Sequence, residues 1–153
     1  PALLAALRAA LDVPISAEGG NPLTDSPAVE SVLALLSFVD HPGDTRHRYH
    51  VASTPLGASF GLGAWGDHAQ ASRVAQRLRE VLARAGLAAF VARCVRELAP
   101  HLGARDLARA QQLLRLTCAF EQRAPFARPG EFVRAIERAR VEDRVAAQVR
   151  VMT

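Results

Sequence analysis

Apolar residues recur at helical spacing through the middle of this chain, and Pro and Gly divide the pattern into separate segments. Between Ser26 and Arg140, leucine, valine and alanine return every three or four residues, which is the period of one buried helix face. Strand character is confined to short runs near the two ends. The pattern therefore predicts a mainly α fold with a small α/β remnant formed by the two chain ends.

Capping residues set the expected helix boundaries. Ser26 is a favourable N-cap with Pro27 at the first helical position. Asp44 and Asp67 open further helices, and Gly86 ends the one that Asp67 opens. We expect helices over 1–11, 27–40, 67–86, 87–98, 104–122 and 131–140, and a short helix after Asp44 that ends at His50 or Ala52. A loop is expected over 54–66, and strands over 13–17 and 147–153.

The two ends of the chain suggest a piece of a larger protein. The chain starts at Pro1 without a Met and stops at Thr153, at the close of a strand-like run. The helix and strand expected over 1–17 break off at Gly19-Gly20, and strand character returns only at 147–153. We interpret these runs as two edges of one α/β domain that flank a helical insertion.

Composition narrows the classes of protein that fit. The 153 residues are half hydrophobic, and no run approaches the ~20 apolar residues that span a bilayer, so no membrane partner is expected. All 19 basic residues are Arg and the net charge is +4, which indicates a phosphate-bearing partner only weakly. Cys94 and Cys118 are expected to be buried thiols. Nothing demands an oxidising compartment, so we expect a cytoplasmic protein.

No motif for catalysis, cofactor binding or metal binding is present. A phosphate-binding loop needs Gly-Lys followed by Ser or Thr, and this chain has no Lys although Gly57, Gly61, Gly63 and Gly66 lie close together. His47 and His50 are three residues apart, without a third metal ligand. The Cys and His residues form no nucleophile motif. We therefore predict no catalytic, cofactor or metal site within this chain.

Arginine clusters are the candidate contacts with nucleic acid. Arg46 and Arg48 lie in a locally basic segment, and Arg73 and Arg77 share a helix stripe with Arg84, away from the apolar face. Such stripes contact phosphate backbones, and they also occur as solvated helix faces. Arg46, Arg48, Arg73 and Arg77 are accordingly predicted DNA contacts, with solvated surface as the alternative.

The segment LLAALRAALDVPISAEGGNPLTDSPAVESVLALLSFVDHPGD resembles superfamily-one DNA helicases of the UvrD, Rep, AddA and RecB type. Val13-Pro14-Ile15, Gly19-Gly20, Val29-Glu30 and Pro42-Gly43-Asp44 carry this resemblance. Residues 53–57, Ser-Thr-Pro-Leu-Gly, resemble the sequence that follows in the AddA and RecB branch, and the RGIG loop of UvrD and Rep is absent. The final segment, EFVRAIERARVEDRVAAQVRVMT, resembles the return to the second RecA-like domain.

The resemblance implies a division of the chain and a role for it. Residues 1–22 would form an edge of the second RecA-like domain, 23–146 a helical insertion of the 2B type, and 147–153 the returning strand. Thr153 would be the first residue of the next helicase motif and a further DNA contact. ATP and Mg²⁺ are implied for the parent helicase and not for this chain. DNA and a partner nuclease or helicase subunit are the implied partners.

Another class of protein fits the same pattern of helices. A helical protein-interaction module of a protein that is not a helicase needs no motif beyond those seen here. The sequence of the parent protein after Thr153 separates the two, because a His-Lys-x-Lys-Gly-Leu-Glu-like run is expected only in the helicase. The resemblance also implies a parent that is an ATP hydrolase, with exonuclease activity in some branches.

Overall fold

The computed structural model describes residues 21–63 and 67–141, and this part of the chain is mainly helical. The helix expected over 1–11, the strands expected over 13–17 and 147–153, and Thr153 lie outside the described residues. The elements, in order, are β1 (Asn21–Pro22), η1 (Leu23–Asp25), α2 (Pro27–Asp40), α3 (Thr45–Ala52), α4 (Pro55–Phe60), α5 (His68–Ala85), α6 (Leu87–Leu98), η2 (Ala99–His101), α7 (Ala104–Arg123), α8 (Pro129–Glu137) and β2 (Arg140–Val141).

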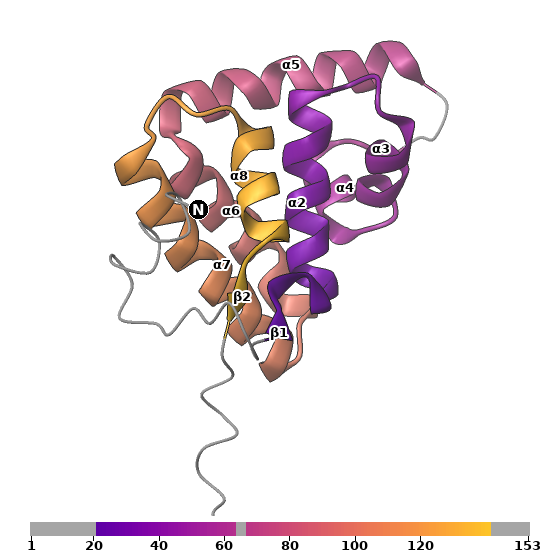
Figure 1. Ribbon diagram of the computed structural model, residues 1–153. Helices are drawn as coiled ribbons and strands as arrows, with labels where there is room; N and C mark the ends of the chain where they lie inside the picture. Colours follow the sequence, from indigo (N-terminus) through magenta and orange to yellow (C-terminus); the bar gives the residue numbers. More distant parts are fainter. Residues whose placement is uncertain (1–20, 64–66, 142–153) are drawn as a thin grey trace, which may run out of the picture.

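Helix α2 occupies the centre of the bundle. Its sequence from Ala28 to Val39 carries a single charge, at Glu30, and residues 31–36 are all buried. A helix that is apolar on every side must be covered on every side. Helices α3 and α4 lie on one side of α2, α7 and α8 lie on the other, and α5 crosses one end (Figure 1). Helix α6 contacts both α4 and α7.

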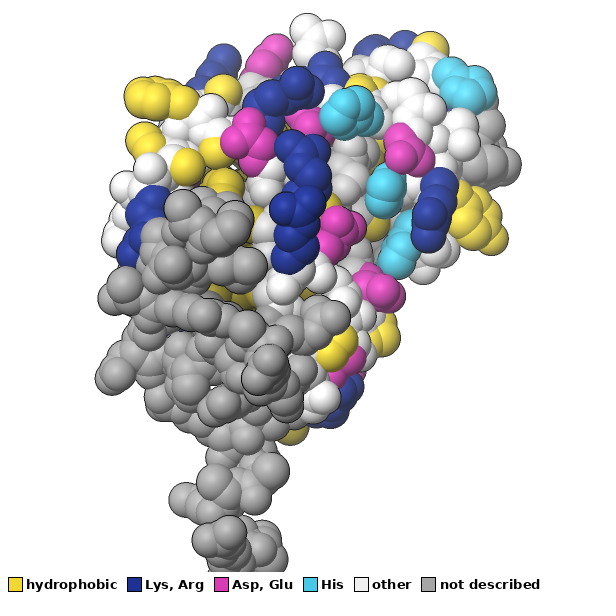
Figure 2. Space-filling view, viewed as in Figure 1, with side chains coloured by type: hydrophobic (Ala, Val, Ile, Leu, Met, Phe, Trp, Pro, Cys, Tyr) yellow, Lys and Arg dark blue, Asp and Glu magenta, His cyan; other side chains and the backbone are white. Residues whose placement is uncertain are grey.

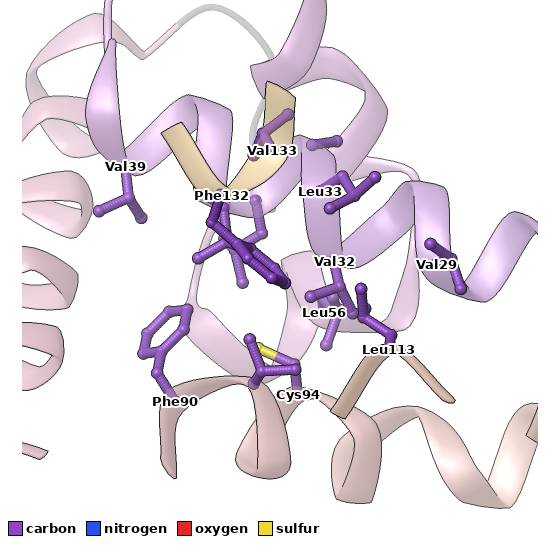
Figure 3. Close-up of a cluster of buried hydrophobic side chains, with 14 of the residues drawn as sticks. Val29, Val32, Leu33, Val39, Leu56, Phe90, Cys94, Leu113, Phe132 and Val133 are labelled. Carbon is purple, nitrogen blue, oxygen red and sulfur yellow. The ribbon is translucent and has the colours of Figure 1, made fainter. Parts of the chain in front are cut away.

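The core forms where side chains from these helices meet around α2. Val32 of α2 lies near Leu56 of α4, Leu113 of α7 and Phe132 of α8 in this cluster (Figure 3). All four side chains are completely buried. Burial of apolar surface stabilises by about 25 cal/mol per Å², so this shared core holds helices from distant parts of the sequence together.

Capping explains why most helices begin where the sequence predicts. The Asp44 carboxylate accepts hydrogen bonds from the backbone amides of Arg46 and His47, at 3.0 and 3.2 Å. Asp67 accepts one from the amide of Gln70, at 2.8 Å. These bonds satisfy amides that have no partner within their own helix. Helix α2 has the predicted boundaries, and α7 ends within one residue of its predicted end. Helix α8 begins two residues earlier and ends three residues earlier than predicted, and β2 begins at Arg140, which was predicted to be helical.

The N-terminus of α6 is capped from another helix. Glu121 of α7 accepts hydrogen bonds from the backbone amides of Leu87 and Ala88. The carboxylate lies so close to Gly86, whose φ is +87°, that a Cβ built on Gly86 would lie 2.5 Å from Glu121 Oε1. The negative charge also favours the positive end of the helix dipole. This cap fixes the crossing of α6 and α7.

The prediction of a loop over 54–66 is wrong in part, because α4 lies within it. Pro55 opens this helix at its first position, Leu56 and Phe60 bury one face, and Gly61 ends it with φ +75°. Gly57 marks a close approach between two helices. A Cβ at Gly57 would lie 2.6 Å from the Val51 carbonyl oxygen and 2.8 Å from Ala52 Cα, so only glycine lets α3 and α4 meet.

The two ends of the helical bundle lie side by side. Asn21 pairs with Val141 and Pro22 with Arg140 in an antiparallel two-residue ladder, β1 with β2. Figure 1 shows this ladder at the base of the bundle, below α2 and α8. The chain therefore enters and leaves the helical domain at the same place.

The two cysteines differ in their surroundings. Cys94 is fully buried on α6, and desolvation raises the pKa of its thiol to about 12. The prediction of burial is therefore confirmed for Cys94. It is wrong for Cys118, which is exposed on α7, because that position falls beside the buried face and not on it.

The close approach at Gly57 gives a first testable expectation. Gly57→Ala forces the α3–α4 corner apart and should lower the free energy of unfolding by about 1–3 kcal/mol, the usual cost of overpacking. Urea unfolding followed by circular dichroism measures the change. Gly43→Ala is the matched control, because a Cβ there meets nothing within 4 Å. Equal stability of the two variants would contradict the packing described for Gly57.

Candidate nucleic-acid interface

The predicted arginine stripe on α5 exists and faces outward. Arg73, Arg77 and Arg84 are all exposed, and the buried residues Ala71, Val74, Ala75 and Leu78 lie on the other side of the helix. At a rise of 1.5 Å per residue, the eleven steps from Arg73 to Arg84 extend over roughly 16 Å. That length corresponds to about five phosphates along one strand of a duplex.

A second helix adds an arginine next to this stripe. Arg77 Nη2 donates a hydrogen bond to the Phe60 carbonyl oxygen, at 2.7 Å. Arg93 of α6 stacks over the Phe60 ring, with 4.9 Å from its Cζ to the ring centroid. Phe60 itself stacks on Phe90, with 6.0 Å between the ring centroids. Two guanidinium groups from different helices therefore converge on the C-terminal end of α4.

Two carboxylates border this surface. Glu80 lies on the exposed side of α5, between Arg77 and Arg84 in sequence. Glu97 of α6 accepts a hydrogen bond from the Ser59 hydroxyl, at 3.1 Å. Arginines still outnumber these acids, so the surface attracts anions through several separate guanidinium groups. We call Arg73, Arg77, Arg84 and Arg93 the α5–α6 arginine surface.

The sequence did not single out Arg93 or Phe60 as members of this surface. Phe60 lies in α4 and Arg93 stacks on it, and this segment was predicted to be a loop. The available signal was the spacing of Leu56 and Phe60, four residues apart between Pro55 and Gly61. Such a spacing marks one helix face even in a segment as short as six residues.

The arginines of α3 separate into one exposed and one buried residue. Arg46 is exposed near the start of the helix. Arg48 retains only 2% of its accessible surface, and its Nη1 lies 3.1 Å from His68 Nδ1. Residues two positions apart are rotated by about 200° around the helix axis, so the side chains of Arg46 and Arg48 point to opposite sides of α3. Arg48 joins α3 to the start of α5 and does not share a surface with Arg46.

The start of α3, which carries Arg46, is held by a carboxylate. Desolvation raises the pKa of Asp44, but hydrogen bonds from the backbone and ring of His47 and from the Arg46 amide outweigh it, and the pKa is lowered. His47 Nδ1 lies 2.7 Å from Asp44 Oδ2. No hydrogen bond or ion pair among the described residues joins Arg46 to Arg73 or Arg77.

Arginines over α8 form a different kind of surface. Figure 2 shows them interleaved with carboxylates on the face that α8 occupies. Arg128 donates from Nε and Nη2 to Asp40 Oδ1, at 3.2 and 3.0 Å. Arg79 donates to the Val39 carbonyl oxygen, at 2.7 Å, and so caps the end of α2. Pairing with a carboxylate lowers the attraction of Arg128 for phosphate, and Arg79 is held at the end of α2.

A third group of charges holds the entrance to the bundle. Arg109 is 1% exposed, and its Nη2 lies 3.1 Å from Asp25 Oδ2. Arg105 Nη2 reaches the same oxygen at 2.8 Å. The Ser26 hydroxyl donates a hydrogen bond to Asp106 Oδ1, at 2.7 Å. The prediction that the Ser26 side chain caps α2 is therefore wrong. This network ties η1, next to β1, to the start of α7.

Searches for other kinds of site give two results for the described part of the chain. No group of three or more His, Cys, Asp or Glu residues in residues 21–63 and 67–141 is placed to hold a metal ion. None of the helices described there is long and apolar enough to cross a membrane.

Comparison with known proteins gives no match. No family model, no curated protein and no solved structure matches it. A function is therefore inferred from the helicase-like residues of the sequence and from the surfaces described above.

The contrast between the two α3 arginines gives a second expectation. Arg48→Ala removes a long, fully buried side chain and its bond to His68, and should lower the free energy of unfolding by about 2–4 kcal/mol. Arg46→Ala should change it by less than about 0.5 kcal/mol, as is usual for an exposed residue. Urea unfolding of both variants checks this. A similar effect of the two substitutions would refute the assignment of Arg48 to the interior.

Proposed function

We propose that this chain is the helical 2B-like insertion of a superfamily-one DNA helicase of the AddA or RecB branch, with edges of the second RecA-like domain at its two ends. The antiparallel pairing of β1 with β2 carries the proposal. An insertion must leave and rejoin its host domain at one place, and the two segments that border this helical bundle are hydrogen-bonded to each other. In the proposal, the small α/β remnant continues from these segments into residues 1–20 and 142–153.

The proposed role of the bundle is to guide duplex or forked DNA in the parent. The α5–α6 arginine surface supports this role, because two of its guanidinium groups, those of Arg77 and Arg93, come from different helices and meet at one residue, Phe60. Contacts of this kind bind phosphates without reading the base sequence. Arg46 adds a separate contact on α3, and Thr153 one at the RecA-like domain. Arg48 is left out because it is buried.

Catalysis belongs to the rest of the parent protein in this proposal. When bound there, ATP and Mg²⁺ supply the energy of translocation. The residues of this chain bind and orient DNA, and they receive the movement of the RecA-like domains through β1 and β2. The network of Asp25, Arg105 and Arg109 makes this entrance rigid, since it fixes η1 to the long helix α7. The proposal also places the protein in the cytoplasm.

An interaction module outside helicases remains the second candidate. The observation in its favour is Phe126, which is 98% exposed at the turn between α7 and α8. Aromatic side chains are frequent anchors of protein interfaces, and this one is open to a partner. This candidate does not require the α5–α6 arginine surface to bind DNA.

The division of labour predicts no nucleotide chemistry in the isolated chain. It contains no Lys and no phosphate-binding motif, so nothing in it provides the charge clamp that phosphoryl transfer needs. Phosphate release and binding of a fluorescent ATP analogue should both stay at background after purification. ATP turnover that follows the protein through a final column would overturn the proposed division.

DNA binding is the direct test of the proposed function. Binding of the chain to a fluorescent forked duplex, measured by anisotropy, should be independent of base sequence and strongly dependent on salt. Three or four neutralised phosphates give a slope of log affinity against log salt of roughly −3. Raising NaCl from 50 to 200 mM should therefore weaken binding by roughly 40-fold or more.

Variants locate the interface. The double variant Arg73→Gln and Arg84→Gln should weaken binding at least tenfold at low salt and make the salt slope shallower by about two. Arg77 is kept, because it also caps α4. The matched control, Arg115→Gln with Arg138→Gln, removes the same charge from other helices and should change binding less than threefold. Equal losses in both double variants, or binding insensitive to salt, would refute the assignment of the α5–α6 arginine surface to DNA.

A further inference from the structure

Phe60, the last residue of α4, contacts arginines from two other helices. Its carbonyl oxygen accepts a hydrogen bond from Arg77 Nη2 of α5, at 2.7 Å. Its ring lies under the guanidinium group of Arg93 of α6, with 4.9 Å from Cζ to the ring centroid. Phe60 itself is only 3% exposed. One buried residue therefore contacts two of the four members of the α5–α6 arginine surface.

Contacts that do not involve the arginines hold Phe60 in place. Its ring stacks on the ring of Phe90, with 6.0 Å between the centroids and 16° between the planes. Phe90 points into the core from α6 (Figure 3). The backbone of α4 is fixed at Gly57, where a Cβ would lie 2.6 Å from the Val51 carbonyl oxygen. The core thus sets the position of both the ring and the carbonyl group of Phe60.

The C-terminal end of α4 binds α5 at two points. A helix leaves its last four carbonyl groups without an intrahelical partner, so the end of α4 has acceptors to offer. Besides the bond from Arg77 to Phe60, Gln70 Nε2 donates to the Gly61 carbonyl oxygen, at 3.3 Å. Residues seven positions apart lie on the same side of a helix, so Gln70 and Arg77 face α4 together.

These contacts leave donors on both guanidinium groups. A guanidinium group has five N–H donors in one plane. The hydrogen bond to Phe60 involves only Nη2 of Arg77. Stacking engages the flat face of the Arg93 guanidinium group and leaves the N–H groups at its edge. Because Arg77 is exposed and Arg93 is partly exposed, a phosphate can reach the remaining donors.

Two nearby acids do not occupy these guanidinium groups. Glu97 of α6, four residues after Arg93, accepts a hydrogen bond from the Ser59 hydroxyl, at 3.1 Å. Glu80 is exposed on α5, three residues after Arg77. Among the described residues, no hydrogen bond or ion pair joins either acid to Arg77 or Arg93. The acids reduce the net charge of the surface but leave the contacts with Phe60 in place.

An arginine that is held in advance binds at a lower cost. A long side chain loses rotamer entropy when it closes on a phosphate, and a side chain already in position has less to lose. We infer that Phe60 is a positioning residue of the α5–α6 arginine surface, and this role rests on the proposed DNA-binding function. Its ring holds Arg93 and its carbonyl group holds Arg77, so that their remaining N–H groups meet phosphates together. Phe60 itself touches no phosphate.

Removal of the ring tests this role. Phe60→Leu keeps an apolar side chain in the core and should weaken binding to the fluorescent forked duplex at low salt roughly three- to fivefold. Arg93→Gln should weaken it at least as much. Phe132→Leu is the matched control, because it removes a buried ring from another aromatic pair, 5.2 Å from Phe120, and should leave binding unchanged. Thermal unfolding checks that each variant is folded during the titration, and Phe60→Met carries the same expectation should Phe60→Leu not fold.

A double-mutant cycle separates positioning from packing. In the Arg93→Gln background, the guanidinium group that the ring holds is gone, so Phe60→Leu should cause no further loss of binding. Arg84→Gln is the matched background. Arg84 belongs to the same surface, and no hydrogen bond or ring contact among the described residues joins it to Phe60. There Phe60→Leu should weaken binding by the same factor as in the unmodified chain, whereas a packing defect would act equally in both backgrounds.

NMR spectroscopy measures the ring contact without DNA. The ring current of Phe60 should shift the Nε–H and Cδ–H resonances of Arg93 upfield in the unmodified chain. Phe60→Leu should abolish this shift and leave the corresponding resonances of Arg84 where they are.

Three outcomes would overturn the role of Phe60 alone. They are unchanged DNA binding in Phe60→Leu, a further loss of binding when Phe60→Leu is added to Arg93→Gln, and Arg93 resonances that Phe60→Leu does not move. Absence of DNA binding by the unmodified chain is a different result. It overturns the proposed function, and the role of Phe60 in that function falls with it.

Discussion

Burial of the middle of α2, residues 31–36, is the constraint on which the rest of this domain depends. A helix that is apolar around its circumference cannot lie on a surface, so the chain must supply neighbours on every side. Helices α3, α5, α7 and α8 do so from positions far apart in sequence. Its C-terminal end is satisfied by Arg79, which donates to the Val39 carbonyl oxygen. A side chain of α5 thus provides the hydrogen-bond donor for a carbonyl group at the end of α2.

The same arrangement divides the arginines into internal and external groups. Arg48 and Arg109 are buried, and Arg79 is bound to backbone carbonyls, so these three stabilise the bundle. Arg73 and Arg84 make no such hydrogen bond among the described residues and are exposed at the surface. A guanidinium group has five donors, which lets it hold several elements at once. In a chain without Lys, arginine must serve both purposes, and net charge alone overstates the charge available to a partner.

Local signals in the sequence were sufficient for most of the helices and insufficient for the surfaces. Asp44, Asp67 and Gly86 act on the backbone beside them, so their helix boundaries follow from sequence alone. Helix α4 was missed because Gly57 is explained only by the close approach of α3, a tertiary contact. Burial of Arg48 and exposure of Cys118 have the same origin. Each depends on which side of a helix its neighbours cover, and a helical period leaves the residues at the edge of the buried face ambiguous.

The joined ends of the bundle connect its fold to its proposed use. Because β1 pairs with β2, a rotation of a host domain would move the bundle as one body about a single narrow connection. Arg105 and Arg109 hold Asp25 next to that connection, so such a rotation is passed to α7 without bending at η1. Helix α7 carries Phe126 beyond its far end, and through Glu121 it fixes α6, which carries Arg93. Helix α7 therefore links the entrance of the domain with the α5–α6 arginine surface.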